Sequence, residues 1–207
     1  MTLRIFILGA SGHTGTQLVD IALARGHAVT AFVRSPAKIS RQHERLTVVR
    51  GDPHNTDELA AAMPGHDVVV TALGVRPPQA FRPHTLVQDC AASTVAAMTR
   101  AGVKRLVLVS AAVLFPMKGI LFGFFKWMLK HIGRDLGAAE DIIRATSLEW
   151  TIARPPRLLS RRDDKYRSQR DALPERGSTM SYRAVAAFAI DAVEQHRHVQ
   201  EIVGLAA

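Results

Sequence analysis

Residues 3–15 read LRIFILGASGHTG, and this stretch decides the fold. Leu3–Leu8 is short and, apart from Arg4, apolar, which is typical of a strand buried on both faces of a parallel sheet. Apolar residues then recur on one helical face of Thr14–Ala24. A glycine-rich loop, G-x-x-G-x-x-G, joins the two segments. A strand, a glycine loop and a helix in this order predict a loop that binds the phosphates of a dinucleotide.

Each glycine of the loop has a physical task in such a site. Gly9 permits the tight turn, Gly12 lets the backbone approach a diphosphate, and Gly15 lets the helix pack close to the strand. The first N–H groups of the helix then face the phosphates. The alternative, a plain strand–helix turn, is disfavoured by the order of the elements. The phosphate site is expected to include these glycines with Ser11, His13 and Thr14.

A second signal follows the next expected strand, which ends at Val33 and is followed by Arg34. An NAD-specific protein usually carries Asp or Glu here, to bind the ribose 2′-hydroxyl, whereas arginine can clamp a 2′-phosphate. Lys38 could add a second positive charge. A surface arginine is the alternative, but the position after the glycine loop favours a cofactor contact. We therefore expect NADP(H) to be preferred over NAD(H).

The rest of the chain alternates between expected strands and expected helices. Strands are expected at 27–33, 46–50, 67–73, 104–110, 149–153 and 201–203, and helices at 56–63, 85–101, 135–145 and 183–194. Thr56 is a candidate N-cap. This alternation predicts a single α/β domain over residues 1–207, with a doubly wound, mostly parallel sheet. Inserts at about 115–133 and 157–177 follow strands five and six, so they are expected at the ligand crevice.

Composition excludes several classes of protein. The 207 residues are 47% hydrophobic and 22% charged, which excludes a disordered chain. The single cysteine excludes an intrachain disulfide, and a cytoplasmic location without a secretory signal is expected. The net charge of +9 suggests an anionic partner. Because there is no nucleic-acid motif, a nucleotide ligand and a solvated basic surface explain this charge better than nucleic acid does.

The first insert is rich in aromatic residues, with five of the twelve in the chain lying at 115–127. Lysines at 118, 126 and 130 interrupt the run, so no transmembrane helix is expected. Packing in the core or against a second subunit is the first interpretation, a flap over a planar substrate the second, and peripheral membrane contact the third. The chain has no HExxH or CxxC pattern, and no metal site is expected.

Together these residues resemble the atypical short-chain dehydrogenase/reductase superfamily, and in it the NAD(P)H-binding group of NmrA-like proteins and the flavin reductase/biliverdin-IXβ reductase. The segment 150–156, WTIARPP, is the part most specific for this group. The resemblance implies that Asp52 and Pro53 flank the adenine and that Ala72, Leu73 and Gly74 lie on the adenosine side of the cofactor. It also implies that Ser110 lies beside the nicotinamide and that Pro155 and Pro156 form the wall behind it.

Two departures from the superfamily pattern constrain the chemistry. Ile132 and Leu136 occupy the usual Tyr-x-x-x-Lys positions, and Arg157 replaces the histidine that follows the double proline of the flavin reductase. A conjugated acceptor, such as a flavin, quinone or tetrapyrrole, spreads the developing charge and does not need that general acid. Ser110 and Arg157 are the candidate catalytic residues, with Arg157 as a clamp for a planar, anionic substrate.

The missing acid also leaves a second interpretation open, a non-catalytic NADP(H)-binding redox sensor of the NmrA-like type. This alternative would bind the cofactor at the same loop and contact a partner without turnover. The sequence leaves the oligomeric state open as well, between monomer and homodimer.

Overall fold

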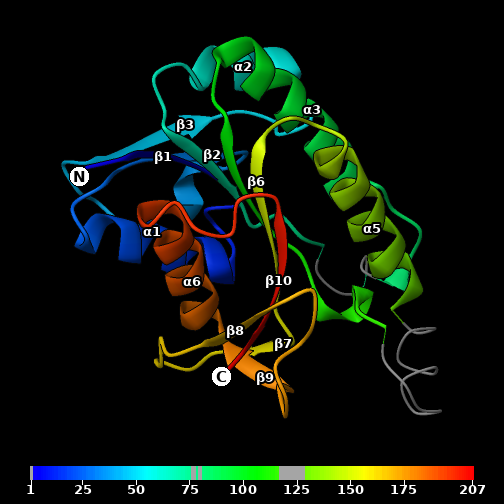
Figure 1. Cartoon of the computed structure of the whole chain (residues 1–207). Helices are drawn as coiled ribbons and strands as arrows, with labels where there is room; N and C mark the ends of the chain where they lie inside the picture. The colour runs from blue at the N-terminus through cyan, green and yellow to red at the C-terminus, as the bar shows by residue number, and fades with distance from the viewer. Residues whose placement is uncertain (1, 76–77, 79–80, 117–128) are drawn as a thin grey trace.

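The protein is built around a twisted eight-stranded sheet (Figure 1). A computed structural model describes residues 2–75, 78, 81–116 and 129–207. The strand order is β3-β2-β1-β4-β5-β6-β10-β8, and all neighbours pair in parallel except β8, which is antiparallel to β10. The strands are β1 (Arg4–Leu8), β2 (Ala28–Val33), β3 (Leu46–Arg50), β4 (Val68–Thr71), β5 (Arg105–Val109), β6 (Glu149–Arg154), β8 (Arg167–Arg170) and β10 (Glu201–Ala206). The predicted single doubly wound α/β domain is confirmed.

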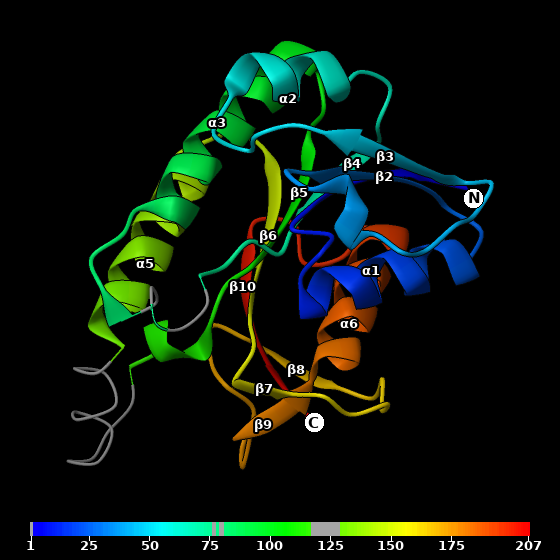
Figure 2. The same ribbon diagram turned by 180° about the vertical axis from the view of Figure 1, so that it is seen from behind.

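Helices cover both faces of this sheet (Figures 1 and 2). The helices α1 (His13–Ala24) and α6 (Tyr182–Glu194) pack together on one face. On the other face α3 (Leu86–Ala101) packs between α5 (Lys130–Arg144) and the short α2 (Thr56–Ala62). Gly102 ends α3 in the left-handed conformation, with φ +72°. Two helical layers therefore enclose the sheet.

The alternation of side chains along β1 explains why the strand is apolar from Ile5 to Leu8. Ile5 and Ile7 belong to the core beneath α1 and α6, whereas Phe6 and Leu8 belong to the core beneath α2, α3 and α5. All four side chains are fully buried. Successive side chains of a strand point to opposite faces, so a strand between two helical layers needs apolar residues at every position.

The N-cap of α2 and the start of α5 differ from the sequence prediction. Asn55, not Thr56, is the N-cap of α2, because its side chain accepts hydrogen bonds from the N–H groups of Asp57 and Glu58. α5 begins at Lys130 instead of Asp135. Gly133 and Gly137 disfavour a helix on propensity, and a Cβ added at either would lie 4.0 or 3.8 Å from the Leu114 side chain. Tertiary packing therefore extends this helix beyond the predicted start.

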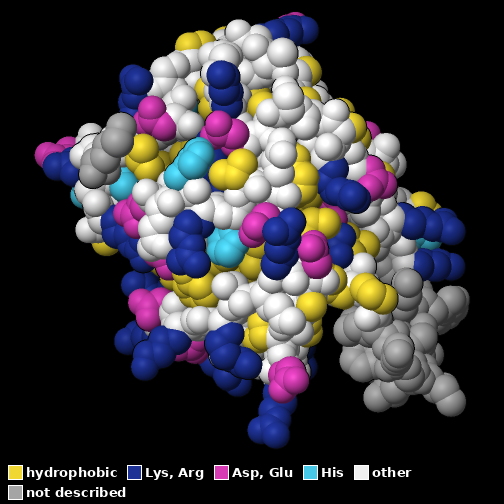
Figure 3. All heavy atoms as spheres, in the orientation of Figure 1, with side chains coloured by type: hydrophobic (Ala, Val, Ile, Leu, Met, Phe, Trp, Pro, Cys, Tyr) yellow, Lys and Arg dark blue, Asp and Glu magenta, His cyan; other side chains and the backbone are white. Residues whose placement is uncertain are grey.

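The second insert contains strands that the sequence did not predict. β7 (Arg157–Leu159) pairs in parallel with β9 (Thr179–Ser181), and β8 covers the free edge of β10. All four side chains of β8 are exposed, so the strand lacks the apolar alternation that identifies strands in a sequence. Lys and Arg side chains are frequent on the lower part of the face in Figure 3, where Figure 1 places these strands.

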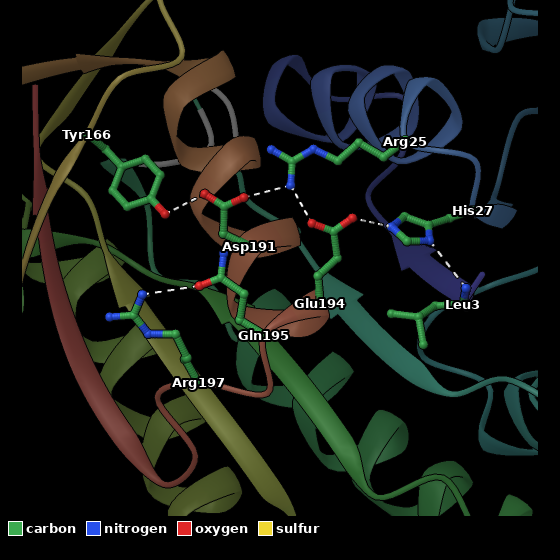
Figure 4. A network of polar contacts seen from close by, with 8 residues as sticks. All are labelled: Leu3, Arg25, His27, Tyr166, Asp191, Glu194, Gln195 and Arg197. Carbon is green, nitrogen blue, oxygen red and sulfur yellow. Dashed lines mark hydrogen bonds and ion pairs between the residues drawn. The ribbon is translucent and has the colours of Figure 1, made fainter. Parts of the chain in front are cut away.

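A polar network ties α6 to α1 and to the loop before β8 (Figure 4). Arg25 donates to Asp191 and Glu194 at 2.6 Å each, and the buried His27 contacts Glu194 at 2.8 Å. The Tyr166 hydroxyl donates to Asp191, and burial together with that carboxylate raises the pKa of the phenol. The network fixes the helix whose first residue, Tyr182, lies beside the glycine loop.

Candidate active site

The glycine loop forms a tight cradle between β1, β4 and α1. Gly9 has φ +81°, and a Cβ there would lie 2.7 Å from the Ala72 carbonyl oxygen. A Cβ on Gly15 would lie only 2.0 Å from the Gly9 carbonyl oxygen. The Gly12 N–H donates to that same oxygen at 2.9 Å. The close approach of these backbones is possible only because the loop has no side chains at these positions.

The N-terminus of α1 is free to bind an anion. Gly12 is the N-cap, no described side chain caps the helix, and its first turn has no acidic residue. The first N–H groups of a helix lack partners within the helix and carry a partial positive charge. Gly12, His13 and Thr14 line a cavity of about 300 Å³. This geometry fits the diphosphate of a dinucleotide.

The cavity extends from this loop along the carboxyl ends of β4 and β5, beginning next to the point between β1 and β4 where the strand order reverses. Ligands of open α/β sheets bind at this reversal. The structure brings several predicted residues together here: Gly12, His13, Thr14, Ala72, Leu73, Gly74 and Ser110. Ile132 and Leu136 also line the cavity. Apolar side chains therefore line the cavity at the two positions that the resemblance assigns to the general-acid pair.

The Ser110 side chain is hydrogen-bonded to a buried ion pair that lies behind the cavity. Its hydroxyl donates to Glu140 at 2.5 Å, and Glu140 accepts two hydrogen bonds from Arg154, at 3.1 and 2.5 Å. The Arg154 guanidinium lies 4.7 Å from the centre of the Phe115 ring. A hydroxyl has one proton to donate, so Ser110 presents only its lone pairs to a ligand. This arrangement suits acceptance of a hydrogen bond from a carboxamide.

A second hollow lies at the carboxyl ends of β2 and β3. Arg34 and Arg50 both line it, together with Gly51, Asp52 and Glu58. Arg50 pairs with Val33 in the sheet, which places it beside Arg34. Lys38 is outside this lining, in the short 3-10 turn Pro36–Lys38, and Pro53 is buried with its carbonyl bound to Ser93. The hollow therefore offers two guanidinium groups to an anion.

The predicted contacts after β6 are less well supported. Pro155 is buried, and its carbonyl accepts a hydrogen bond from the N–H of Ala112. Pro156 and Arg157 do not line the described cavity, whereas Leu158 does. Neighbouring side chains of a strand point in opposite directions, so Arg157 faces away from it. The Arg157 clamp stays a prediction. Most of the aromatic insert, residues 117–128, lies outside the described residues.

Sequence reasoning missed several polar residues of the site. They are Arg50, His84, Asp135, Glu140 and Arg154. Arg50 could have been found by applying to β3 the strand-end argument that identified Arg34. His84, Asp135 and Glu140 belong to no local motif, and Arg154 lies in the 150–156 segment without a predicted role. The segment before α3, α5 and β6 bring these residues together only in the folded chain.

The fold and the two hollows define an NAD(P)H-binding Rossmann protein of the atypical short-chain dehydrogenase/reductase type. The chain belongs to the NAD(P)H-binding family, whose sequence model matches residues 9–196. A chloroplastic protein of Arabidopsis thaliana is 31% identical over 74% of this chain, which spans 59% of that relative. The predicted family and its cofactor class are confirmed.

Solved structures agree with this assignment. A Rossmann-fold NAD(P)-binding protein from Shigella flexneri is 26% identical, with a TM-score of 0.79 over 99% of this chain and 93% of its own. A short-chain dehydrogenase/reductase from Veillonella parvula, solved in complex with NADP, is 23% identical and shares the fold. Its TM-score is 0.81 over 100% of this chain and 95% of its own. None of the helices in the described residues is long and apolar enough to cross a membrane.

Proposed function

We propose that the protein is an NADPH-dependent reductase of a conjugated, planar acceptor, such as a flavin, a quinone or a tetrapyrrole. The observation that carries this proposal is the continuity of the first cavity, from the free N-terminus of α1 to Ser110 and the apolar pair Ile132 and Leu136. A conjugated acceptor needs less acid assistance than a simple ketone, because its charge is delocalised as it forms.

Each part of the site has a separate task in this reaction. NADPH supplies the hydride when it is bound. The N–H groups at the start of α1 bind the diphosphate, and Arg34 with Arg50 binds the 2′-phosphate. Ser110 accepts a hydrogen bond from the carboxamide and so orients the reactive ring. Ile132, Leu136 and Leu158 provide an apolar surface for the acceptor.

The arginine pair predicts the cofactor preference. Arg34→Ala should raise the Kd for NADPH by about 10- to 100-fold, because hydrogen bonds to charged groups contribute about 1.5–3 kcal/mol each. Arg50→Ala should have a similar or smaller effect. The Kd for NADH should stay unchanged, since NADH lacks the 2′-phosphate. Fluorescence titration of both cofactors measures this difference.

Arg41→Ala is the matched control. Arg41 is exposed and pairs with Asp20 at 3.7 Å, outside the lining of the hollow. This variant should bind both cofactors as the natural protein does. If Arg34→Ala weakened NADPH and NADH equally, the 2′-phosphate assignment would be wrong.

The reductase proposal itself is tested by turnover. Purified protein with NADPH should consume the cofactor when FMN, menadione or biliverdin is added, with a rate that saturates in the acceptor. Absorbance at the reduced nicotinamide band follows the reaction. NADPH binding without turnover of any acceptor would instead favour the redox sensor, for which the missing Tyr-x-x-x-Lys pair is the supporting observation.

A further inference from the structure

A histidine stands in the wall of the first cavity, on the segment that precedes α3. His84 Nδ1 lies 2.9 Å from Asp135 Oδ2, and the His84 side chain is 14% exposed. Both residues line the cavity with Ser110, Ile132 and Leu136. An imidazole and a carboxylate in contact form the unit by which many enzymes hold a proton at a defined atom.

The carboxylate of this pair is held in a fixed position. Asp135 is fully buried in α5, and it accepts hydrogen bonds from the N–H groups of Val87 at 3.0 Å and Gln88 at 2.9 Å. These N–H groups belong to the first turn of α3, where the helix dipole favours a negative charge. A fixed carboxylate orients the imidazole.

The other ring nitrogen of His84, Nε2, has no hydrogen-bond partner among the described residues. Both ring nitrogens are buried and lack a hydrogen bond to the described residues, and Nδ1 is the one that lies 2.9 Å from Asp135 Oδ2. Folded proteins rarely leave a buried polar atom without a partner unless it has a function. Because Nδ1 faces Asp135 and the ring lines the cavity, Nε2 is the atom available to a ligand.

Other polar side chains of the cavity are less suited to give a proton. The Ser110 hydroxyl already donates to Glu140. Tyr182 packs on His13, with 5.0 Å between the ring centres, so it lies at the phosphate end of the site. His84 and Asp135 lie with Ile132 and Leu136, which occupy the positions of the missing general acid.

We propose that His84 is the proton donor of the reductase and that Asp135 positions it, an inference that rests on the proposed function. In quinone reduction the acceptor gains a hydride from NADPH, which leaves as NADP⁺. One acceptor oxygen gains the proton of the His84 Nε2–H bond. The electron pair of that bond stays on Nε2, and water reprotonates the imidazole after the product leaves.

Two variants of His84 test this role with menadione as acceptor. His84→Ala and His84→Gln should each lower kcat by about 100-fold or more, the usual contribution of a general acid. The Kd for NADPH should stay unchanged in both. Added imidazole should restore turnover in His84→Ala, where it can enter the vacated space, but not in His84→Gln. A merely structural role would not produce this selective rescue.

His43→Gln is the matched control, because His43 is exposed and lies outside the cavity. It should keep the kcat of the natural protein. If both His84 variants kept kcat as well, the donor role would be overturned while the reductase function stood. If the natural protein reduced no acceptor, the reductase function would fail, and the donor role with it.

Discussion

Gly15→Ala is expected to abolish measurable NADPH binding and to lower the melting temperature by about 5–10 °C. The added Cβ would lie 2.0 Å from the Gly9 carbonyl oxygen and 2.7 Å from the Ala10 Cα, both of them backbone atoms that no rotamer change can move. α1 would have to shift away from β1. Overpacking of this kind costs about 1–3 kcal/mol, and each kcal/mol lowers Tm by about 2–4 °C at this chain length. Thermal unfolding and fluorescence titration measure the two effects.

Gly137→Ala is the control for the loss of a glycine as such. Gly137 lies inside α5, where a Cβ would make an ordinary contact of 3.8 Å with Leu114. Alanine favours a helix by about 1 kcal/mol over glycine, so this variant should be as stable as the natural protein or more stable. NADPH binding by Gly15→Ala at the natural affinity would show that the cradle can relax, contrary to our expectation.

The sequence could predict the sheet because its strands carry local signals. The five residues of β3 match the predicted bounds, and β1 ends at the predicted Leu8. Each parallel strand is buried on both faces or followed by glycine, so its composition alone sets it apart from a helix. The phosphate loop was equally readable, since its glycines are needed by backbone geometry within a single strand–helix unit.

The parts that escaped prediction depend on long-range pairing. The exposed side chains of β8 give no strand pattern, and the strand exists because its backbone pairs with β10. Ser110 was predicted, but the direction of its hydroxyl depends on Glu140, which α5 brings to the end of β5. The contact between His84 and Asp135 likewise needs α3 and α5 to pack together. No spacing rule describes such contacts.

Removal of one partner of the ion pair behind Ser110 should have the largest effect on stability. Glu140→Ala is expected to lower the free energy of unfolding by about 3–5 kcal/mol, the usual cost of leaving one member of a buried pair without the other. The Glu140 side chain is 2% exposed and that of Arg154 is 12% exposed, so water cannot replace the lost partner. The Ser110 hydroxyl would lose its acceptor too. Urea denaturation measures the difference.

A double-mutant cycle separates the effect of the ion pair on stability from the effect of the volume that its two side chains fill. In this cycle Glu140→Leu and Arg154→Met should each cost about as much as Glu140→Ala, because each leaves one buried charge unpaired. The double variant Glu140→Leu with Arg154→Met removes both charges and should recover much of the loss. Arg144→Ala is the control: its pair with Asp141 is exposed at 3.5 Å and should contribute less than about 1 kcal/mol. Should Glu140→Ala cost no more than Arg144→Ala, Ser110 would not be anchored by a stabilising pair. Its hydroxyl could then turn toward the cavity, and Ser110 would compete with His84 as the proton donor.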